Sequence, residues 1–342
     1  MPRCHANFTT TSAAVIDRRA LLISTGVHSR PPTTAKVSEQ MMRKVLVTGA
    51  AGFIGRHMMT AFAEMGDDVV GIDDLSAQGS HLGENVRKCR VEDLQPDDVK
   101  DTEILLHLAA SKRVDTSFTD LTSVGRNVQA DAHIFELAYQ IRLPTLVFAS
   151  SCEVYGPHAE ERGSAEDGIL TPDSPYAVGK WASERILHTT RELFPATDVR
   201  IARLFNVYGE DEATTAVIPE FLGRVENRKP LVVHGSGQQS RDFNYIDDAV
   251  DMILRVCKSP IVPPVLNIGS GVATRICDVA DIISTFGEGA SAISYGPSRP
   301  NEVITFRSDT QLWRSSMGSL PSRSLEDGLR QCWMRRVNDN EP

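Results

Sequence analysis

Between residues 44 and 209, five short and nearly continuous apolar runs alternate with longer amphipathic stretches. Runs rich in Val, Ile and Leu, with no polar residue at every second position, are typical of strands buried on both faces of a parallel sheet. Strands are expected at residues 44–49, 68–73, 104–110, 145–151 and 198–209, and helices at 53–65, 123–142 and 176–193. This alternation predicts an α/β fold built on a doubly wound parallel sheet.

After about residue 210 the regular alternation is lost. Residues 217–230 are expected to form a helix, 231–235 a short strand, and 241–257 a strand that continues into a helix. The sequence therefore predicts a smaller mixed α/β lobe beside the sheet. We expect one domain at 43–209, to which 241–257 return, and a second lobe at 210–240 and 258–335. A ligand would lie between them, at the carboxyl ends of the strands.

Composition and charge disfavour several classes of protein. The 41% hydrophobic and 24% charged residues are ordinary for a soluble globular chain. The net charge of −9, without a large basic block, gives no electrostatic support for a nucleic-acid partner. No apolar run is long enough for a membrane-spanning helix. The six cysteines include no CxxC pair, which disfavours a metal site or disulfide framework and favours reduced thiols in the cytoplasm.

Residues 1–40 differ from the rest of the chain. They are rich in Ser, Thr and Arg, poor in acidic residues, and contain Pro31 and Pro32. This composition allows a transit peptide, but a disordered extension or an upstream start codon is the favoured interpretation. Met41 and Met42 lie directly before the first expected strand and would serve as a natural beginning.

Three glycines follow the first expected strand and precede the first expected helix. Gly49, Gly52 and Gly55 would let the backbone approach a pyrophosphate, and the amino end of the helix would supply N–H donors to it. Asp73 ends the next strand, 18 residues after Gly55, where the acid would meet the ribose hydroxyls of an adenosine. Because an acid repels a 2′-phosphate, this pattern predicts a Rossmann domain that binds NAD rather than NADP. A purely structural glycine turn is the alternative.

A tyrosine and a lysine lie four residues apart on an expected helix. Tyr176 and Lys180 would share one helix face, and a nearby ammonium is expected to lower the pKa of the phenol. The phenolate could then take a proton from a sugar or alcohol hydroxyl. Ser151, at the end of an expected strand, could hold the same hydroxyl. Alone, a Tyr-x-x-x-Lys pair is often accidental, but with the glycine loop and the serine it predicts a redox active site.

The chain resembles the extended short-chain dehydrogenase/reductase family, the NAD-dependent nucleotide-sugar epimerases and dehydratases. The resemblance runs from about Lys44 to about Trp333. It rests on the strings TGAAGFIG, HLAAS, SSCEVYG, YAVGK, RLFNVYG, QQSRDFNYIDD, NIGSG and SRPNE. It implies that residues 43–209 bind NAD and that the smaller lobe binds a UDP-sugar, with no metal ion.

The resemblance also implies which residues contact each ligand. Cofactor contacts would come from Gly49, Gly52, Phe53, Ile54, Gly55, Asp73, Asp93, Leu108, Ala109, Ala110, Lys112, Tyr176 and Lys180. Substrate contacts would come from Ser151, Asn206, Val217, Arg241 and Arg299. In this scheme Asp93 lies near the adenine, and Lys112 and Lys180 lie near the nicotinamide ribose. Asn206, Arg241 and Arg299 hold the diphosphate, whose charge suits guanidinium groups.

Cys152 and Glu153 follow Ser151 and distinguish the chain within this family. The 4-epimerases resemble one another in small or neutral residues here, the 4,6-dehydratases in an Asp-Glu pair, and the UDP-glucuronate decarboxylases in Ser-Glu. By this resemblance, Glu153 removes the proton at C5 of the sugar and Cys152 protonates the departing 6-hydroxyl. A thiol with a pKa of about 8.5 is mostly protonated at pH 7 and can donate that proton. A buried cysteine that only fills space is the alternative.

Several longer strings resemble one subgroup of the family. These are SCEVYG, HLAASKRVDTSF at 107–118 and RPNEVITFRSDT at 299–310. They are similar to the UDP-N-acetylglucosamine 5,6-dehydratases of tunicamycin-type nucleoside antibiotic biosynthesis. That implies loss of water through a transient 4-keto intermediate to a 5,6-exocyclic alkene. A UDP-sugar 4-epimerase, a 4,6-dehydratase, a decarboxylase and a non-catalytic NAD-binding regulatory module stay open as alternatives.

The resemblance also implies a homodimer. Family members commonly dimerise through two helices per subunit, which correspond here to 123–142 and 176–193. An apolar stripe of Ile134, Leu137, Ala138 and Ile141 could form that contact, but packing in the core explains such a stripe equally well.

Overall fold

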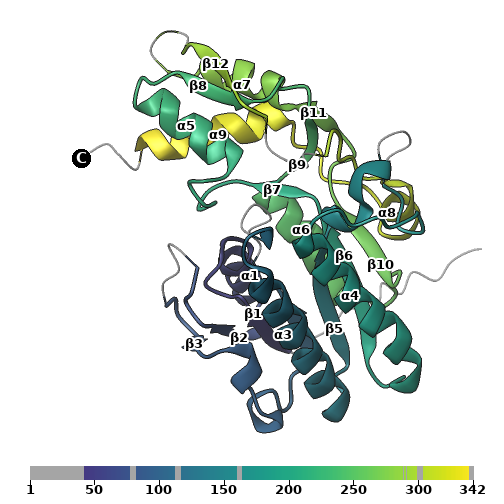
Figure 1. Ribbon diagram of the computed structural model, residues 1–342. Coiled ribbons are helices and arrows are strands. Elements are labelled where there is room, and N and C mark those ends of the chain that lie inside the picture. The colour runs from purple at the N-terminus through teal and green to yellow at the C-terminus, as the bar shows by residue number, and fades with distance from the viewer. Residues whose placement is uncertain are drawn as a thin grey trace, which may run out of the picture. The chain divides into compact units, whose positions relative to one another are not determined.

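Seven parallel strands form the central sheet of the computed structural model, in the order β10-β6-β5-β4-β1-β2-β3 (Figure 1). The structure describes residues 42–77, 82–111, 117–159, 164–287, 289, 291–298 and 303–338. The strands are β1 (Lys44–Thr48), β2 (Asp68–Asp73), β3 (Val86–Lys88), β4 (Ile104–His107), β5 (Thr145–Ser151), β6 (Asp198–Leu204) and β10 (Val265–Ile268). The predicted doubly wound sheet is confirmed. The expected extension at 1–40 lies outside the described residues.

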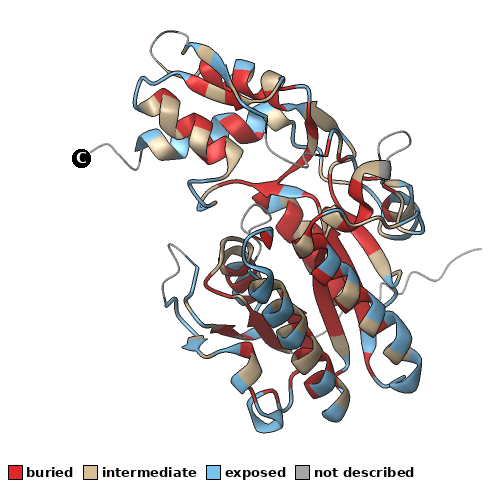
Figure 2. Ribbon diagram, in the orientation of Figure 1, coloured by how far each residue is buried: buried red, intermediate tan, exposed pale blue. Residues whose placement is uncertain are grey.

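Two pairs of helices cover the two faces of this sheet. Val45 and Val47 of β1 point into a core shared with α1 (Phe53–Glu64) and α6 (Ile246–Lys258). Leu46, between them, points to the opposite face, into a core shared with the other pair. That pair is α3 (Leu121–Gln140) and α4 (Pro175–Thr190), which lie side by side (Figure 1). Figure 2 shows the strands buried and the outer helix faces exposed, so the continuous apolar runs reflect burial on both sides.

The strand order reverses between β1 and β4. From β1 the chain extends the sheet outward through β2 and β3, and then returns to β4 on the other side of β1. The loops after β1 and β4 therefore diverge at the carboxyl edge of the sheet. Such a switch point is where open α/β sheets bind their ligands.

The smaller lobe contains two short sheets. One has the order β11-β9-β7, and the other pairs β12 with β8. Its strands are β7 (Asn206–Tyr208), β8 (Leu231–His234), β9 (Ser240–Tyr245), β11 (Ala273–Arg275) and β12 (Ile293–Gly296). The described helices of this part are α5 (Val217–Glu226), α7 (Ile276–Ser284), α8 (Gln311–Ser316) and α9 (Leu325–Asn338).

Two expected features of strand assignment differ from the structure. Residues 198–209, expected as one strand, are divided at Phe205, whose N–H donates to the carbonyl of Ile268 over 3.0 Å. After this residue the chain leaves the large sheet, and β7 pairs with β9 instead. Residues 265–268, expected in the smaller lobe, form the edge strand β10 of the large sheet because they pair with β6. The exact domain boundaries stay a prediction.

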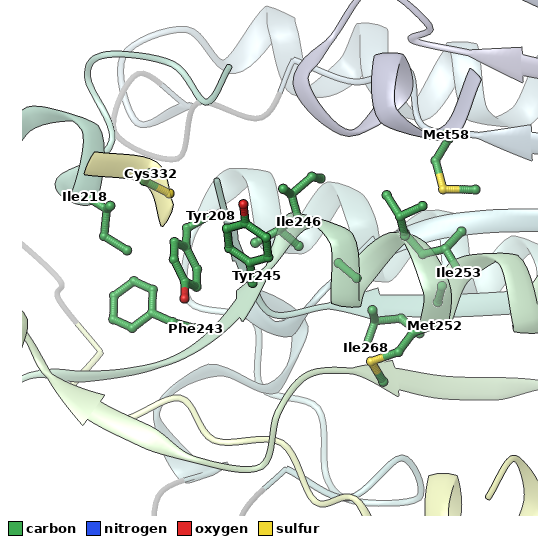
Figure 3. Packing of buried hydrophobic residues seen from close by; sticks show 14 of the residues in the cluster. Met58, Tyr208, Ile218, Phe243, Tyr245, Ile246, Met252, Ile253, Ile268 and Cys332 are labelled. Carbon is green, nitrogen blue, oxygen red and sulfur yellow. The ribbon is translucent and has the colours of Figure 1, made fainter. Parts of the chain in front are cut away.

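One continuous hydrophobic cluster joins the large sheet to the smaller lobe. Figure 3 shows Met58 of α1 near Ile253 of α6, and Tyr208, Phe243 and Tyr245 at the junction. The cluster continues to Ile218 of α5 and Cys332 of α9, which lie in the smaller lobe. Helix α6 therefore packs on the large sheet while its preceding strand belongs to the smaller lobe.

The apolar stripe on α3 belongs to the core. Ile134, Leu137 and Ala138 are buried in the cluster between α3 and the sheet, and Ile141 packs against that cluster. Of the two explanations for this stripe, core packing is therefore the one that the structure supports. None of the helices in the described part of the chain has the length and apolar character that a membrane span requires.

The shared core gives a prediction for stability. Replacing Ile253, which is 1% exposed, by Ala removes buried methyl groups and should lower the free energy of unfolding by about 2–5 kcal/mol. The matched control is Ile261→Ala, because Ile261 is 85% exposed and its loss should change stability by less than about 0.5 kcal/mol. Urea denaturation followed by circular dichroism measures both. Equal effects of the two substitutions would contradict this assignment of the core.

Candidate active site

A cleft of about 2150 Å³ lies along the carboxyl edge of the large sheet. Residues from both lobes line it, including Phe306 and Val303 from the segment before α8. The sequence-predicted site residues that line it are Gly49, Gly52, Phe53, Ile54, Gly55, Asp73, Leu108, Ala109, Ala110, Glu153, Tyr176, Lys180, Asn206 and Arg241. The structure thus gathers most of the predicted residues around one space, although their individual contacts with ligands stay predictions.

The glycine loop after β1 has a geometry that requires glycine at two positions. Gly49 has a φ of +70°, and a Cβ there would lie 2.8 Å from the amide nitrogen of Ala109. A Cβ on Gly55 would lie 2.0 Å from the carbonyl oxygen of Gly49. Helix α1 begins after Gly52, which has no side chain to cap it. The amino end of the helix lies at the cleft and fits the pyrophosphate of a dinucleotide.

Asp73 lies at the end of β2, at the rim of the same cleft. Its carboxylate accepts hydrogen bonds from the N–H groups of Ala51, over 3.0 Å, and Leu75, over 2.7 Å. The first bond ties β2 to the glycine loop, so the acid and the loop are held in one arrangement. This placement fits an acid that meets ribose hydroxyls beside a pyrophosphate.

Five predicted ligand contacts do not line the cleft or lie outside the described residues. Ser151, the last residue of β5, is partly buried and does not line it. Asp93 is exposed at the end of a short 3-10 helix and does not line the cleft, whereas Arg90, Val91 and Glu92 do. The predicted contact of Asp93 with an adenine stays a prediction. Val217 begins α5, just after the lining residues 214–216. Lys112 and Arg299 lie outside the described residues.

Tyr176 is held at the start of α4. Ser174 caps this helix by accepting a hydrogen bond from the N–H of Ala177 over 3.1 Å, and Pro175 occupies the first helical position. Tyr176 is 9% exposed. Burial raises the pKa of its phenol, the negative charge of Glu153 raises it further, and a hydrogen bond with Ser151 opposes these effects. The phenol is therefore protonated in the chain without ligands.

Lys180 lines the cleft and lies beside an acidic residue that the sequence analysis did not single out. Its ammonium lies 3.8 Å from Oδ2 of Asp131 and 4.4 Å from the ring centre of Phe148. Burial lowers the pKa of Lys180, and Asp131 opposes that effect. The pKa of Tyr176 is raised in the structure, first by burial. The predicted effect of Lys180 on that pKa stays a prediction, and the structure adds Asp131 as the acid beside the lysine.

Glu153 and Cys152 follow β5 in a short 3-10 segment (Cys152–Ala159). The N–H of Glu153 donates to Oγ of Ser151 over 3.2 Å, and Glu153 lines the cleft. Burial raises the pKa of its carboxyl, and the nearby charge of Arg241 partly opposes this. Carboxylates with a raised pKa are better general bases near neutral pH than ordinary ones.

Cys152 lies behind this surface rather than on it. It is 4% exposed and packs in a small apolar cluster with Val154, Tyr155 and Phe205. Burial raises the pKa of its thiol well above the usual value, Glu153 raises it further, and a hydrogen bond with Ser151 opposes them. The thiol therefore carries its proton at neutral pH. Cys152 was predicted either to act as a general acid or only to fill space in the core, and this position is compatible with both roles.

Arg241 and Asn206 approach the cleft from the small three-stranded sheet. Arg241 donates from Nη1 to the carbonyl oxygens of Ser240, over 2.8 Å, and Val303, over 2.9 Å. Its guanidinium lies 5.3 Å from the ring centre of Phe306. A cation fixed in this way beside a cleft suits an anionic ligand. Within the described residues, no group of His, Cys, Asp or Glu is arranged to hold a metal ion.

Comparison with known proteins agrees with the fold and the glycine loop. The model of the NAD-dependent epimerase/dehydratase family matches residues 45–269. This range includes the glycine loop, the Ser-Cys-Glu segment and the Tyr-Lys pair. The chain therefore belongs to the NAD-dependent epimerase/dehydratase family, and the predictions of that family and of NAD as cofactor are confirmed.

Among the similar proteins, some are named as epimerases and others as dehydratases. An uncharacterized UDP-glucose epimerase of Bacillus subtilis strain 168, YtcB, is 30% identical and matches 84% of this chain and 95% of its own length. The structure of TunA, an NAD-dependent NDP-hexosamine 5,6-dehydratase of tunicamycin biosynthesis, is similar with a TM-score of 0.82 at 33% identity, over 86% of this chain and 98% of its own. MoeE5, solved with UDP-glucuronic acid and NAD, has a TM-score of 0.78 at 30% identity, over 86% and 99%.

The geometry of the cofactor end predicts the effect of one substitution. Asp73→Ala should weaken NAD binding by about tenfold or more, because it removes the acceptor for ribose hydroxyls and frees the glycine loop. The matched control is Asp68→Ala, at the exposed opposite end of the same strand, which should leave NAD affinity unchanged. Isothermal titration of NAD measures both. Unchanged affinity in Asp73→Ala, in a folded protein, would contradict the assignment.

Proposed function

We propose that this enzyme removes water from a UDP-sugar, and specifically converts UDP-N-acetylglucosamine to its 5,6-exocyclic alkene. The proposal includes a role in nucleoside antibiotic biosynthesis of the tunicamycin type. The observation that carries it is the placement of Glu153 and the protonated thiol of Cys152 next to Tyr176, with Ser151 between them. The similarity to TunA, at 33% identity, supports the same assignment.

The residues around the cleft have complementary tasks in this reaction. NAD, when bound, supplies the oxidation and re-reduction that make a sugar C–H bond acidic for a short time. Tyr176 takes the proton of the 4-hydroxyl, and Ser151 orients that hydroxyl. The carbonyl that forms at C4 acidifies the hydrogen on C5, and Glu153 removes it. A proton from Cys152 then allows the 6-hydroxyl to leave as water, so the net reaction is loss of one water molecule.

The buried position of Cys152 suggests how its proton reaches the sugar. The thiol is not among the residues that line the cleft, but it is hydrogen-bonded to Ser151. Ser151 does not line the cleft either, but it is hydrogen-bonded to Glu153 and Tyr176, which do. A proton can pass along such bonds, so Ser151 would give its own proton to the 6-hydroxyl and take one from Cys152. Arg241 would hold the diphosphate end of the substrate, on the same side of the cleft as Glu153.

A UDP-sugar 4-epimerase is the second candidate. An epimerase needs no acid at C6, and the absence of Cys152 from the residues that line the cleft favours this reading. The similarity to YtcB, at 30% identity, supports it as well. Glu153 argues against it, because an epimerase removes no proton from C5.

We further propose a homodimer formed through the outer faces of α3 and α4. Val178 and Trp181 of α4 and Leu121 of α3 are exposed apolar side chains on these two helices. Burial of such residues between two copies would remove apolar surface from water. The homodimer and a cytoplasmic location both stay predictions.

The first test is the product formed from UDP-N-acetylglucosamine. Incubation of the purified chain with NAD and this sugar in deuterated water, followed by proton NMR and mass spectrometry, should show loss of water and two vinylic protons at C6. A methyl group at C6 would instead identify a 4,6-dehydratase. A galacto product of unchanged mass would identify a 4-epimerase, and binding without turnover would favour a regulatory module.

Substitutions in the Cys-Glu pair test the separate steps. Glu153→Gln should retain slow oxidation at C4 but lose exchange of the C5 hydrogen with deuterium, because an amide does not act as a base near neutral pH. Cys152→Ala should retain that exchange and slow elimination by about 10²–10⁴-fold, the range typical of a general acid. The control is Cys257→Ala, another buried cysteine, located on α6. Equal elimination rates in the two cysteine variants would make Cys152 a packing residue.

A further inference from the structure

A buried chain of polar side chains runs beneath the cleft from β1 to α4. Oγ1 of Thr48, the residue before Gly49, lies 2.6 Å from Nδ1 of His107 at the end of β4. Nε2 of His107 lies 2.9 Å from Oδ1 of Asp131 on α3. The other carboxylate oxygen of Asp131 accepts from the hydroxyl of Ser183, over 2.7 Å, and lies 3.8 Å from Nζ of Lys180.

Donors and acceptors along this chain are matched. The N–H of Ala109 donates to Oγ1 of Thr48 over 3.3 Å, and this oxygen lies 2.6 Å from Nδ1 of His107, close enough for a hydrogen bond. On the other side of the ring, Nε2 of His107 lies within 2.9 Å of Oδ1 of Asp131 and can donate to it. The carboxylate of Asp131 can therefore accept two hydrogen bonds and lies near the ammonium of Lys180. Its oxygens have partners within the protein and need no bound water.

Asp131 has no exposed surface, so its charge must be matched within the protein. Burial raises the pKa of its carboxyl, but the charge of Lys180, the hydrogen bond and charge of His107, and the hydrogen bond from Ser183 together lower it further than burial raises it. The carboxylate is thus ionised. Lys180, also buried, has its ammonium between this carboxylate and the ring of Phe148.

Other titratable groups also lie near Lys180 and Tyr176. Glu184, on α4, acts on Lys180, but its carboxylate is paired with Arg203 through hydrogen bonds of 3.0 and 2.8 Å. Glu153 and the thiol of Cys152 face the phenol of Tyr176 rather than the lysine. Asp131 is therefore the carboxylate in direct contact with Lys180 within the described residues.

We propose that Asp131 is a positioning residue of this enzyme, which holds Lys180 as an ammonium in one place and thereby sets the proton affinity of Tyr176. His107 and Thr48 fix the orientation of the carboxylate and link it to the glycine loop. The part of this proposal that concerns proton transfer rests on the proposed function. The pairing of Asp131 with Lys180 does not.

The effect on catalysis is tested with Asp131→Asn, which keeps the shape of the side chain and removes its charge. Loss of the negative charge lowers the pKa of Lys180, which loses its counter-ion, and also lowers the pKa of Tyr176, which loses a repelling charge. Activity requires the ammonium and the deprotonated phenol, so both limbs of the pH profile of kcat/KM should move to lower pH by about one unit.

Ser183→Ala is the control for the pH profile. It removes one hydrogen bond to the same carboxylate but no charge, so its profile should keep the wild-type limbs whatever its effect on the rate. A purely structural Asp131 would give Asp131→Asn a lower rate at every pH with both limbs in place. That result, or the same shift in both variants, would overturn the proposal.

A second experiment needs no turnover. Lys180→Met leaves Asp131 buried without a counter-ion, which is unfavourable. Asp131→Asn should therefore raise the urea midpoint of the Lys180→Met protein, although it lowers that of the wild type. A lower midpoint for the double variant than for Lys180→Met would refute the pairing. If Asp131→Asn alone does not fold, comparison of Lys180→Met with the double variant still tests the pairing. If the wild type turns over no UDP-sugar, the proposed function fails while this result stands.

Discussion

The contact between the ends of β1 and β4 is the constraint on which the rest of the site depends. The two strands are neighbours at the switch point of the sheet, and a Cβ on Gly49 would lie 2.8 Å from the backbone of Ala109. The side chains before these loops meet as well, in the 2.6 Å contact of Thr48 with His107. Because the glycine loop and the β4 loop are joined in this way, the end of the cleft that suits a dinucleotide is held in one geometry. Helices α3 and α4 are positioned relative to that end.

Buried charge is the second organising feature, and it explains why Tyr176 is protonated in the chain without ligands. The negative charges of Glu153 and Asp131 both raise the pKa of the phenol, in addition to its burial. The hydrogen bond with Ser151 opposes these effects, and Lys180 lies 3.8 Å from Asp131. The phenol of Tyr176 therefore keeps its proton in the chain without ligands. A tyrosine that ionised earlier would require an uncompensated anion in a buried position.

Features that depend on local pattern could be predicted from the sequence, and features that depend on distant partners could not. The apolar runs and the glycine spacing predicted the sheet and the cofactor loop because burial and close approach restrict residue type locally. The divergence of β7 after Phe205 depends on pairing with β9. The position of Asp93 depends on a turn, and the role of Lys180 depends on Asp131. One signal was present: Asp131 begins the stripe that continues with Ile134 and Ala138, and an acid in an apolar stripe indicates a buried partner.

The same reasoning bears on why a cysteine follows Ser151. Its side chain lies among apolar residues, including Phe205 and Phe306, with the carboxylate of Glu153 next to it. An aspartate in this place would have to bury a second negative charge beside the first, at a cost that burial and like-charge repulsion both increase. A thiol can be buried in its neutral form and still carries a proton. Burial of Cys152 is therefore no argument against an acid role, and the decisive point is whether its bond to Ser151 connects that proton to the cleft.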